Sequence, residues 1–459
     1  MHGKTREITS DRALTPRATA DASGLIVPHS VENGPLRVVG IARMRASHVT
    51  IALLTAVLCA TAGLGYAIIA GHLWTDSRSF IDNHFLRWSW AKFIQDTPVP
   101  AQIYRFHILD AFQHHLDARY DQHFPFAYPP TFLLVIWPLG LLSRFAAYGA
   151  FLGTSLALYL VACWHRPWGA LNTGLALIAP STVVTLFAAQ NALLLAALMI
   201  GGCRLMDKRP VLAGVLFGVM SFKPQFGLLL PLALVSAREW RGFAAATATV
   251  LAGVLASGMA FGWATWAALP TALTQLARFV APIRAFSEGS PTVTATLRLF
   301  GAGPAIAQEG QLAAAVLAGG VVFLCFRRGF SPLPIAALLV GTFLTTPYAF
   351  YYDLPIVSYA VLAVGIDARD SRVALRIWEV AVLVLAILLP YLLFFSPFGL
   401  PYGGPVLALL FVLIVRRCFT ADCRPMQSAM EPSTRPILQP PWDRLAIATG
   451  QPFLPERGA

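Results

Sequence analysis

Long apolar runs separated by short basic clusters fill the chain from residue 129 to residue 417, and this alternation constrains the fold most. The clusters lie at residues 165–166, 204–209, 238–241, 327–328, 367–376 and 416–417. Such alternation is typical of transmembrane helices whose Lys- and Arg-rich loops face the cytoplasm. Only 12% of the 459 residues are charged, about half the share found in soluble proteins. The sequence therefore predicts an all-α, polytopic membrane protein and excludes a soluble enzyme.

The net charge of +12 does not by itself indicate a nucleic-acid partner. A nucleic-acid binder gathers its basic residues on one face, whereas here they separate apolar runs, so membrane lipids are the expected partners. None of the six cysteines falls in the long polar loop after the first apolar run, and no disulfide framework is indicated. The sequence carries no nucleotide-binding or zinc-binding motif, and no cofactor is expected.

The basic clusters also predict the topology. If each of them faces the cytoplasm, every interval between two clusters must contain an even number of crossings. Three intervals then divide at polar breaks, which are residues 190–191, 223–225 and 345–353. The result is about twelve spans with both tails in the cytoplasm. Residues 130–164 leave two alternatives open, one span with a re-entrant piece or two spans.

The ends of the chain differ from its centre. The first apolar run, residues 50–70, begins too late for a signal peptide and is predicted to be an uncleaved membrane anchor. Residues 1–46 and 419–459 are polar and dotted with proline, so we expect two flexible cytoplasmic tails. Residues 47–418 between them are predicted to form the membrane-embedded domain.

The three polar breaks share one side of the membrane in this topology, opposite the basic clusters. The two arms of segment 210–237 have about 13 residues each and reach about 20 Å, against a hydrocarbon core of about 30 Å. Their tip is therefore predicted to dip into the membrane from the extracytoplasmic side. Irregular backbone at that depth is tolerated only where protein or a wet cavity shields it, so the breaks predict a cavity.

Residues 71–128 form a long extracytoplasmic loop in this topology, rich in aromatic residues and histidine. Two segments, 80–93 and 103–116, place apolar side chains on one helical face. Those side chains are Phe80, Phe85, Trp88 and Phe93 in the first, and Phe106, Leu109, Phe112 and Leu116 in the second. Helices of this kind are typical of the bilayer interface, where we expect both.

His107, His114 and His115, together with Asp110, are of residue types that ligate metals. A histidine-rich amphipathic surface is the commoner reason for such a group. No metal site is predicted from it.

Ionisable residues in or beside the membrane are candidates for function. Here they are Asp76 and Asp82 after the first span, Lys223 in one polar break and Asp353 in another. Each has a structural alternative. The two loop aspartates could be solvated acids, Lys223 could extend to the interface, and Asp353 could cap a helix. Tyr128, before two prolines, could be an interfacial aromatic residue.

At these positions the chain resembles glycosyltransferase family 87, a group of membrane transferases with the GT-C fold that use polyprenyl-phosphate mannose. The resemblance spans about residues 50–415. It rests on segments 124–142, 212–225 and 346–353, on Gln190 and Asn191, and on Arg238 to Arg241. Each motif alone is weak, because apolar helices look alike, but their order and spacing together are specific.

The resemblance implies a catalytic aspartate in the first extracytoplasmic loop, followed directly by aromatic residues. Asn83 follows Asp82 in this chain, and the aromatics come later, at Phe85, Trp88 and Trp90. Asp76 lacks the aromatic context. We therefore favour Asp82 over Asp76 as the catalytic base, with Asp76 as the alternative.

Sugar transfer from a lipid phosphate needs a base for the acceptor hydroxyl and hydrogen-bond donors or positive charge on the departing phosphate. Lys223 is the predicted phosphate ligand, and the other predicted substrate-binding residues are Gln225, Gln190, Tyr128, Tyr352 and Asp353. Because the protein supplies cations, a bound metal is not required. The resemblance implies an inverting hexosyltransferase at the outer face of a bacterial inner membrane, with a polyprenyl-phosphate sugar as donor and a lipid or glycan as acceptor.

The competing interpretation is a transporter or flippase of a lipid-linked sugar. A transporter predicts repeat symmetry and a binding site near the bilayer midplane. Polar breaks on one side beside a long loop favour chemistry at one membrane face instead. They also argue against a purely structural membrane protein.

Overall fold

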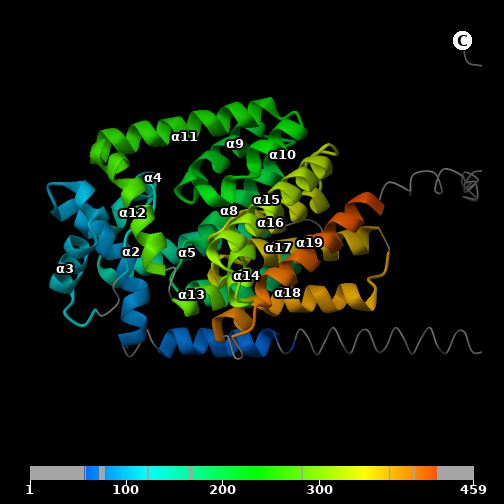
Figure 1. Cartoon of the computed structure of the whole chain (residues 1–459), viewed down its shortest axis with the longest axis horizontal. Helices are drawn as coiled ribbons and strands as arrows, with labels where there is room; N and C mark the ends of the chain where they lie inside the picture. Colours follow the sequence, from blue (N-terminus) through cyan, green and yellow to red (C-terminus); the bar gives the residue numbers. More distant parts are fainter. Residues whose placement is uncertain are drawn as a thin grey trace, which may run out of the picture. The chain divides into compact units, whose positions relative to one another are not determined.

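The computed structural model describes residues 56, 58–71, 78–120, 124–164, 169–280, 283–371, 373–395 and 399–420, with only the backbone for 78–84, 280 and 285. The chain divides into two compact units, Met1–Ala56 and Val57–Ala459. All named helices belong to the second unit, shown in Figure 1. No strand occurs in the described ranges. The predicted tails lie outside them, except that α19 runs to Thr420, slightly beyond the predicted boundary at residue 418.

Five helices are long and apolar enough to cross a membrane. They are α5 (Arg144–Cys163), α11 (Trp240–Phe261), α15 (Pro304–Phe326), α18 (Ile377–Phe395) and α19 (Gly403–Thr420). A sixth candidate is the pair α6 (Gly169–Ile178) and α7 (Pro180–Phe187), which is bent by 51°. The bend falls where Pro180 begins α7, since proline cannot donate the hydrogen bond that would continue α6. The chain is thus a polytopic helical membrane protein.

The remaining apolar helices are shorter than a full span. They are Leu58–Gly71, Thr131–Leu141 (α4, Thr131–Ile136, with η2, Trp137–Leu141), α8 (Ala192–Leu205), Pro210–Phe222 (α9, Pro210–Val219, with η3, Met220–Phe222), Pro224–Ser236 (η4, Pro224–Gly227, with α10, Leu230–Ser236) and α16 (Pro332–Thr345). Twelve full spans therefore stay a prediction. Within 130–164 only α5 has spanning length, which favours one span with a short preceding piece.

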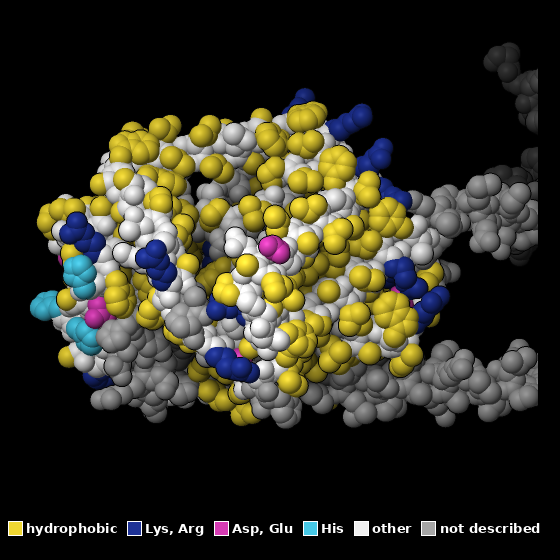
Figure 2. All heavy atoms as spheres, viewed as in Figure 1, with side chains coloured by type: hydrophobic (Ala, Val, Ile, Leu, Met, Phe, Trp, Pro, Cys, Tyr) yellow, Lys and Arg dark blue, Asp and Glu magenta, His cyan; other side chains and the backbone are white. Residues whose placement is uncertain are grey.

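The centre of the unit is built on α16, whose side chains are almost all buried. It packs against α15, α19 and α17 (Pro355–Asp370). A helix that is apolar on every side needs such complete cover. The outer helices differ, because α11 exposes Leu251, Leu255 and Met259, and apolar side chains cover much of the face in Figure 2. An exposed apolar surface of this extent is suited to lipid.

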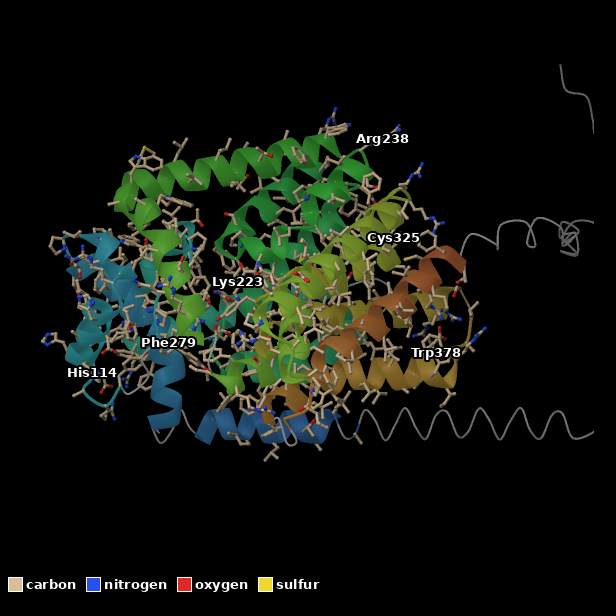
Figure 3. All side chains as sticks on the ribbon, in the orientation of Figure 1. His114, Lys223, Arg238, Phe279, Cys325 and Trp378 are labelled. Atoms are coloured by element: carbon tan, nitrogen blue, oxygen red, sulfur yellow. The ribbon has the colours of Figure 1, made fainter. Side chains whose placement is uncertain are left out.

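The basic clusters at 238–241, 327–328, 367–376 and 416–417 lie toward one end of the unit (Figure 3). Arg238, Cys325 and Trp378 lie toward that end in Figure 3, and His114 lies toward the other. Ion pairs join the helix ends there, from Arg416 to Glu379 and from Arg417 to Asp367. This arrangement agrees with the sequence-based alternation, in which the clusters share one side of the membrane.

The long loop contains α2 (Arg78–Asp96), η1 (Pro100–Tyr104) and α3 (Phe106–Leu116). The aromatic face of its first helix, which was predicted to lie in the bilayer interface, packs against protein in this structure. Phe85, Trp90 and Phe93 of α2 are fully buried in protein, and Gln113 of α3 donates a hydrogen bond to Ser89 Oγ at 2.8 Å. The aromatic pattern was interpreted as contact with lipid, but α2 packs against η2, α5, α4, η1 and α3.

Candidate active site

A cavity of about 420 Å³ lies where the polar breaks meet. Its wall comes from α2, segment 124–129, the three breaks and α12 (Ala264–Val280). The surface is hollowed between α12 and α14 (Val293–Leu299) in Figure 2, and Figure 3 places Lys223 in the interior, away from the basic end. The lining residues are Leu86, Trp90, Phe124, Pro125, Ala127, Tyr128, Pro129, Gln190, Phe222, Lys223, Pro224, Gln225, Leu269, Leu273, Leu276, Ala277, Thr346, Pro347, Tyr348, Tyr352 and Asp353.

The breaks place polar side chains at the cavity because helices stop there. Gln190 follows the end of α7, where Ala189 adopts a φ of 49°, a conformation that costs a non-glycine residue about 1–2 kcal/mol. Lys223 stands between η3 and η4, and the following Pro224 prevents a continuous helix. Asp353 ends η5 (Tyr351–Asp353), and Leu354 separates it from α17.

Lys223 and Asp353 form a buried ion pair in the cavity wall. The distance from Lys223 Nζ to Asp353 Oδ1 is 2.5 Å, and only 6% and 3% of the two side chains are exposed. Asp353 Oδ2 also accepts a hydrogen bond from the backbone N–H of Phe350 at 3.1 Å. The ammonium group lies 5.6 Å from the centre of the Tyr352 ring. Burial and fixed partners hold the pair in place.

The structural alternatives for these two residues have different outcomes. Lys223 does not extend to the interface, because its side chain is buried beside Asp353. Asp353 is not the N-cap of α17, which is Leu354. Its carboxylate does cap η5, because it accepts a hydrogen bond from the N–H of Phe350, the N-cap of that short helix.

Tyr128 belongs to an aromatic part of the lining. Its ring packs on Phe132 with 4.4 Å between centroids and lies 5.8 Å from Trp90. The Tyr104 hydroxyl donates to its carbonyl oxygen at 2.7 Å. Beside it, α12 contributes Leu269, Leu273 and Leu276, whose spacing puts them on one helix face. The cavity thus joins an apolar wall to a charged, polar floor.

All six residues predicted to bind substrate line this cavity: Tyr128, Gln190, Lys223, Gln225, Tyr352 and Asp353. For the candidate bases the structure says less. Position 82 lies on α2 one turn before Leu86, and helical register places positions 82, 86 and 90 near one face. Leu86 and Trp90 line the cavity. Asp76 lies outside the described residues.

Arg87 was missed in the sequence. Its side chain is 5% exposed, and its Nη2 donates to Gln190 Oε1 at 2.5 Å. The guanidinium carbon lies 5.9 Å from the Trp90 ring centre and 5.8 Å from that of Phe151. An arginine between Phe85 and Trp88, inside an aromatic segment, was the available signal. It was overlooked because α2 was expected at the bilayer interface, where an arginine is common and needs no functional explanation.

The described residues contain no group of three His, Cys, Asp or Glu side chains close enough to hold a metal ion. Of the histidines weighed for such a role, His114 lies toward the end of the unit opposite the basic clusters (Figure 3). Its ring packs near Tyr120, with 6.3 Å between the centroids.

Comparison with known families gives a match to the model of glycosyltransferase family 87 over residues 126–347, slightly less than half of the chain. The matched range contains Tyr128, Gln190, Lys223 and Gln225, and it ends at Pro347 of the third break. No curated protein and no solved structure matches the chain. The match confirms the resemblance to glycosyltransferase family 87.

Proposed function

We propose that the chain transfers a hexose, in the first instance mannose, from a polyprenyl-phosphate sugar to a lipid or glycan acceptor at the extracytoplasmic face of a bacterial inner membrane. The observation that carries this proposal is the cavity itself, where an apolar wall adjoins a buried ammonium group. A polyprenyl chain fits the apolar wall of α12. Its phosphate needs hydrogen-bond donors, which the polar part of the lining offers.

Lys223 is suited to the phosphate although it is paired. An ammonium group has three protons, and Asp353 accepts one of them. Two remain for the phosphate oxygens, and Asp353 keeps the group aimed at one place. Gln225 and the Tyr128 hydroxyl add further donors along the lining. Donors fixed before the reaction stabilise charge as it develops on the leaving group.

The reaction would proceed by direct displacement. The acceptor hydroxyl attacks the sugar C1, its proton passes to the carboxylate of Asp82, and the C1–O bond to the phosphate breaks. Polyprenyl phosphate leaves with both bonding electrons, and the configuration at C1 is inverted. Leu86 and Trp90, one and two turns along α2 from position 82, keep water from that part of the cavity.

The test is transfer by the purified protein. It is incubated with radiolabelled polyprenyl-phosphate sugars and a membrane lipid extract, with and without EDTA. We expect a labelled lipid or glycan product of inverted configuration, formed equally in both conditions, and no product from the Lys223→Met variant. Movement of label across a sealed vesicle membrane without product would refute the transferase and support the transporter.

A further inference from the structure

Arg87 is a charged group buried beside the cavity without an opposite charge. None of the described carboxylates pairs with it. Its Nη2 donates to the neutral amide of Gln190, and the neutral hydroxyl of Tyr128 is a second polar neighbour. The Nε and Nη1 atoms have no hydrogen-bond partner. A buried guanidinium in a membrane protein is unfavourable unless another group compensates it. Residues kept in this state are candidates for binding a ligand of opposite charge.

The other charges at the cavity do not compensate Arg87. Lys223 and Asp353 form a pair, so their charges cancel. Apart from the proposed base Asp82, whose side chain is not among those described, the cavity and its immediate surroundings therefore carry one positive charge without an opposite partner, and Arg87 is its source. A negative ligand gains from that charge even without touching Arg87, because Coulomb interactions weaken slowly in a low-dielectric interior.

Arg87 also determines how Gln190 faces the cavity. A guanidinium has donors and no acceptor, so the amide oxygen of Gln190 must point toward Arg87. The amide NH₂ group is then left for the cavity, which Gln190 lines. The sharp turn at Ala189 fixes the backbone just before it. With Arg87 present, Gln190 offers the cavity donors, as an anion requires.

We propose that Arg87 is the counter-charge for the donor phosphate and the positioning residue for Gln190. This inference rests on the proposed function, in which an anionic lipid enters the cavity. Lys223, already neutralised by Asp353, then supplies hydrogen bonds, while Arg87 supplies the net charge. The specificity that follows is for a lipid phosphate over an uncharged lipid of the same chain length.

The test compares two ligands that differ in charge. Polyprenyl phosphate and the uncharged polyprenol are titrated against the full chain in nanodiscs, with the fluorescence of Trp90 and the other tryptophans as the signal. Wild type should prefer the phosphate. Arg87→Met should weaken phosphate binding about tenfold or more, the usual loss for one charged hydrogen-bonding partner, and polyprenol binding less than about twofold. Arg87→Lys, which keeps the charge, should lie between.

A second variant separates charge from structure. Gln190→Glu would place a carboxylate against Arg87, so the pair should form, with thermal stability at or above that of wild type. The cavity would nevertheless lose both its net charge and the amide donor, and phosphate binding should fall as in Arg87→Met. Arg204→Met is the matched control, since Arg204 also donates to a neutral acceptor, the Ala162 carbonyl, away from the cavity. It should leave both affinities unchanged.

Three results would overturn the inference. They are equal affinity of wild type for the two ligands, phosphate binding by Arg87→Met at the wild-type level, and an equal loss of both ligands in Arg87→Met, which would show a structural role only. Failure of the proposed function looks different. In that case wild type prefers the phosphate and the variants behave as described, but no sugar is transferred.

Discussion

The ion pair between Lys223 and Asp353 gives the sharpest test of the cavity. Both side chains are almost fully buried, so solvent screening is small. Removing one partner leaves the other charge buried and unpaired, which typically costs about 3–5 kcal/mol. For a chain of this size that loss corresponds to a fall in melting temperature of roughly 3–5 °C. We expect this for Lys223→Met and for Asp353→Asn or Asp353→Leu.

The double variant Lys223→Met with Asp353→Leu should behave differently. Replacing both members of a buried pair by apolar side chains is often neutral or stabilising, so its melting temperature should return to near that of wild type. Sugar transfer should not return, because the ammonium protons are gone. Recovery of stability without activity would show that the pair stabilises the fold and that Lys223 also binds the substrate.

The assay is thermal unfolding in one detergent for the wild type, both single variants and the double variant, with transfer measured on the same samples. The coupling energy from this double-mutant cycle should exceed about 2 kcal/mol. Single variants as stable as wild type, or losses that simply add in the double variant, would show that the two groups do not interact in the folded protein. Transfer by the double variant would remove Lys223 from the mechanism.

Three further predictions concern the loop and the topology. Asp82→Asn should slow transfer by about a hundredfold while Asp76→Asn is mild, and the reverse result would move the base to Asp76. Hydrogen bonds from two arginines, Arg119 first, lower the pKa of Asp117 from 3.8 to about 2. Its contribution to stability is therefore present above about pH 4 and lost as the pH falls toward 2, so Asp117→Asn should flatten acid unfolding in that range. A single cysteine at Gln225 in a cysteine-free background should react with an impermeant thiol reagent outside spheroplasts, and labelling of one at Lys208 would refute the topology.

Local signals in the sequence predicted much of this molecule. Apolar length and basic clusters give the helices and their alternation, because burial in lipid acts on each segment separately. Segment 210–236 is a second example, because the length of its two arms alone indicates that neither spans the membrane. The polar residues at the breaks met at one cavity for the reason expected, that a polar side chain and open backbone need shelter within a membrane.

The parts that were missed depend on contacts between distant segments. The aromatic face of α2 could have met lipid or protein, and only its packing against α3, α4, α5 and η1 decides. Lys223 and Asp353 are 130 residues apart, and no periodicity links them. Arg87 contacts Gln190 across 103 residues. Arg87 stands out because no described carboxylate pairs with it, and a sequence alone does not show which charges meet in the fold.

The distance along the chain between Lys223 and Asp353 has a consequence for biogenesis. Ribosomes make residue 223 long before residue 353, so the tip of segment 210–236 carries an uncompensated ammonium group during the interval. That tip should stay at the water-exposed surface until η5 arrives, and the cavity would close as one of the last steps of assembly. A nascent chain stopped before residue 345 should leave a cysteine at position 225 more reactive than in the complete protein, and equal reactivity would argue that the tip settles without its partner.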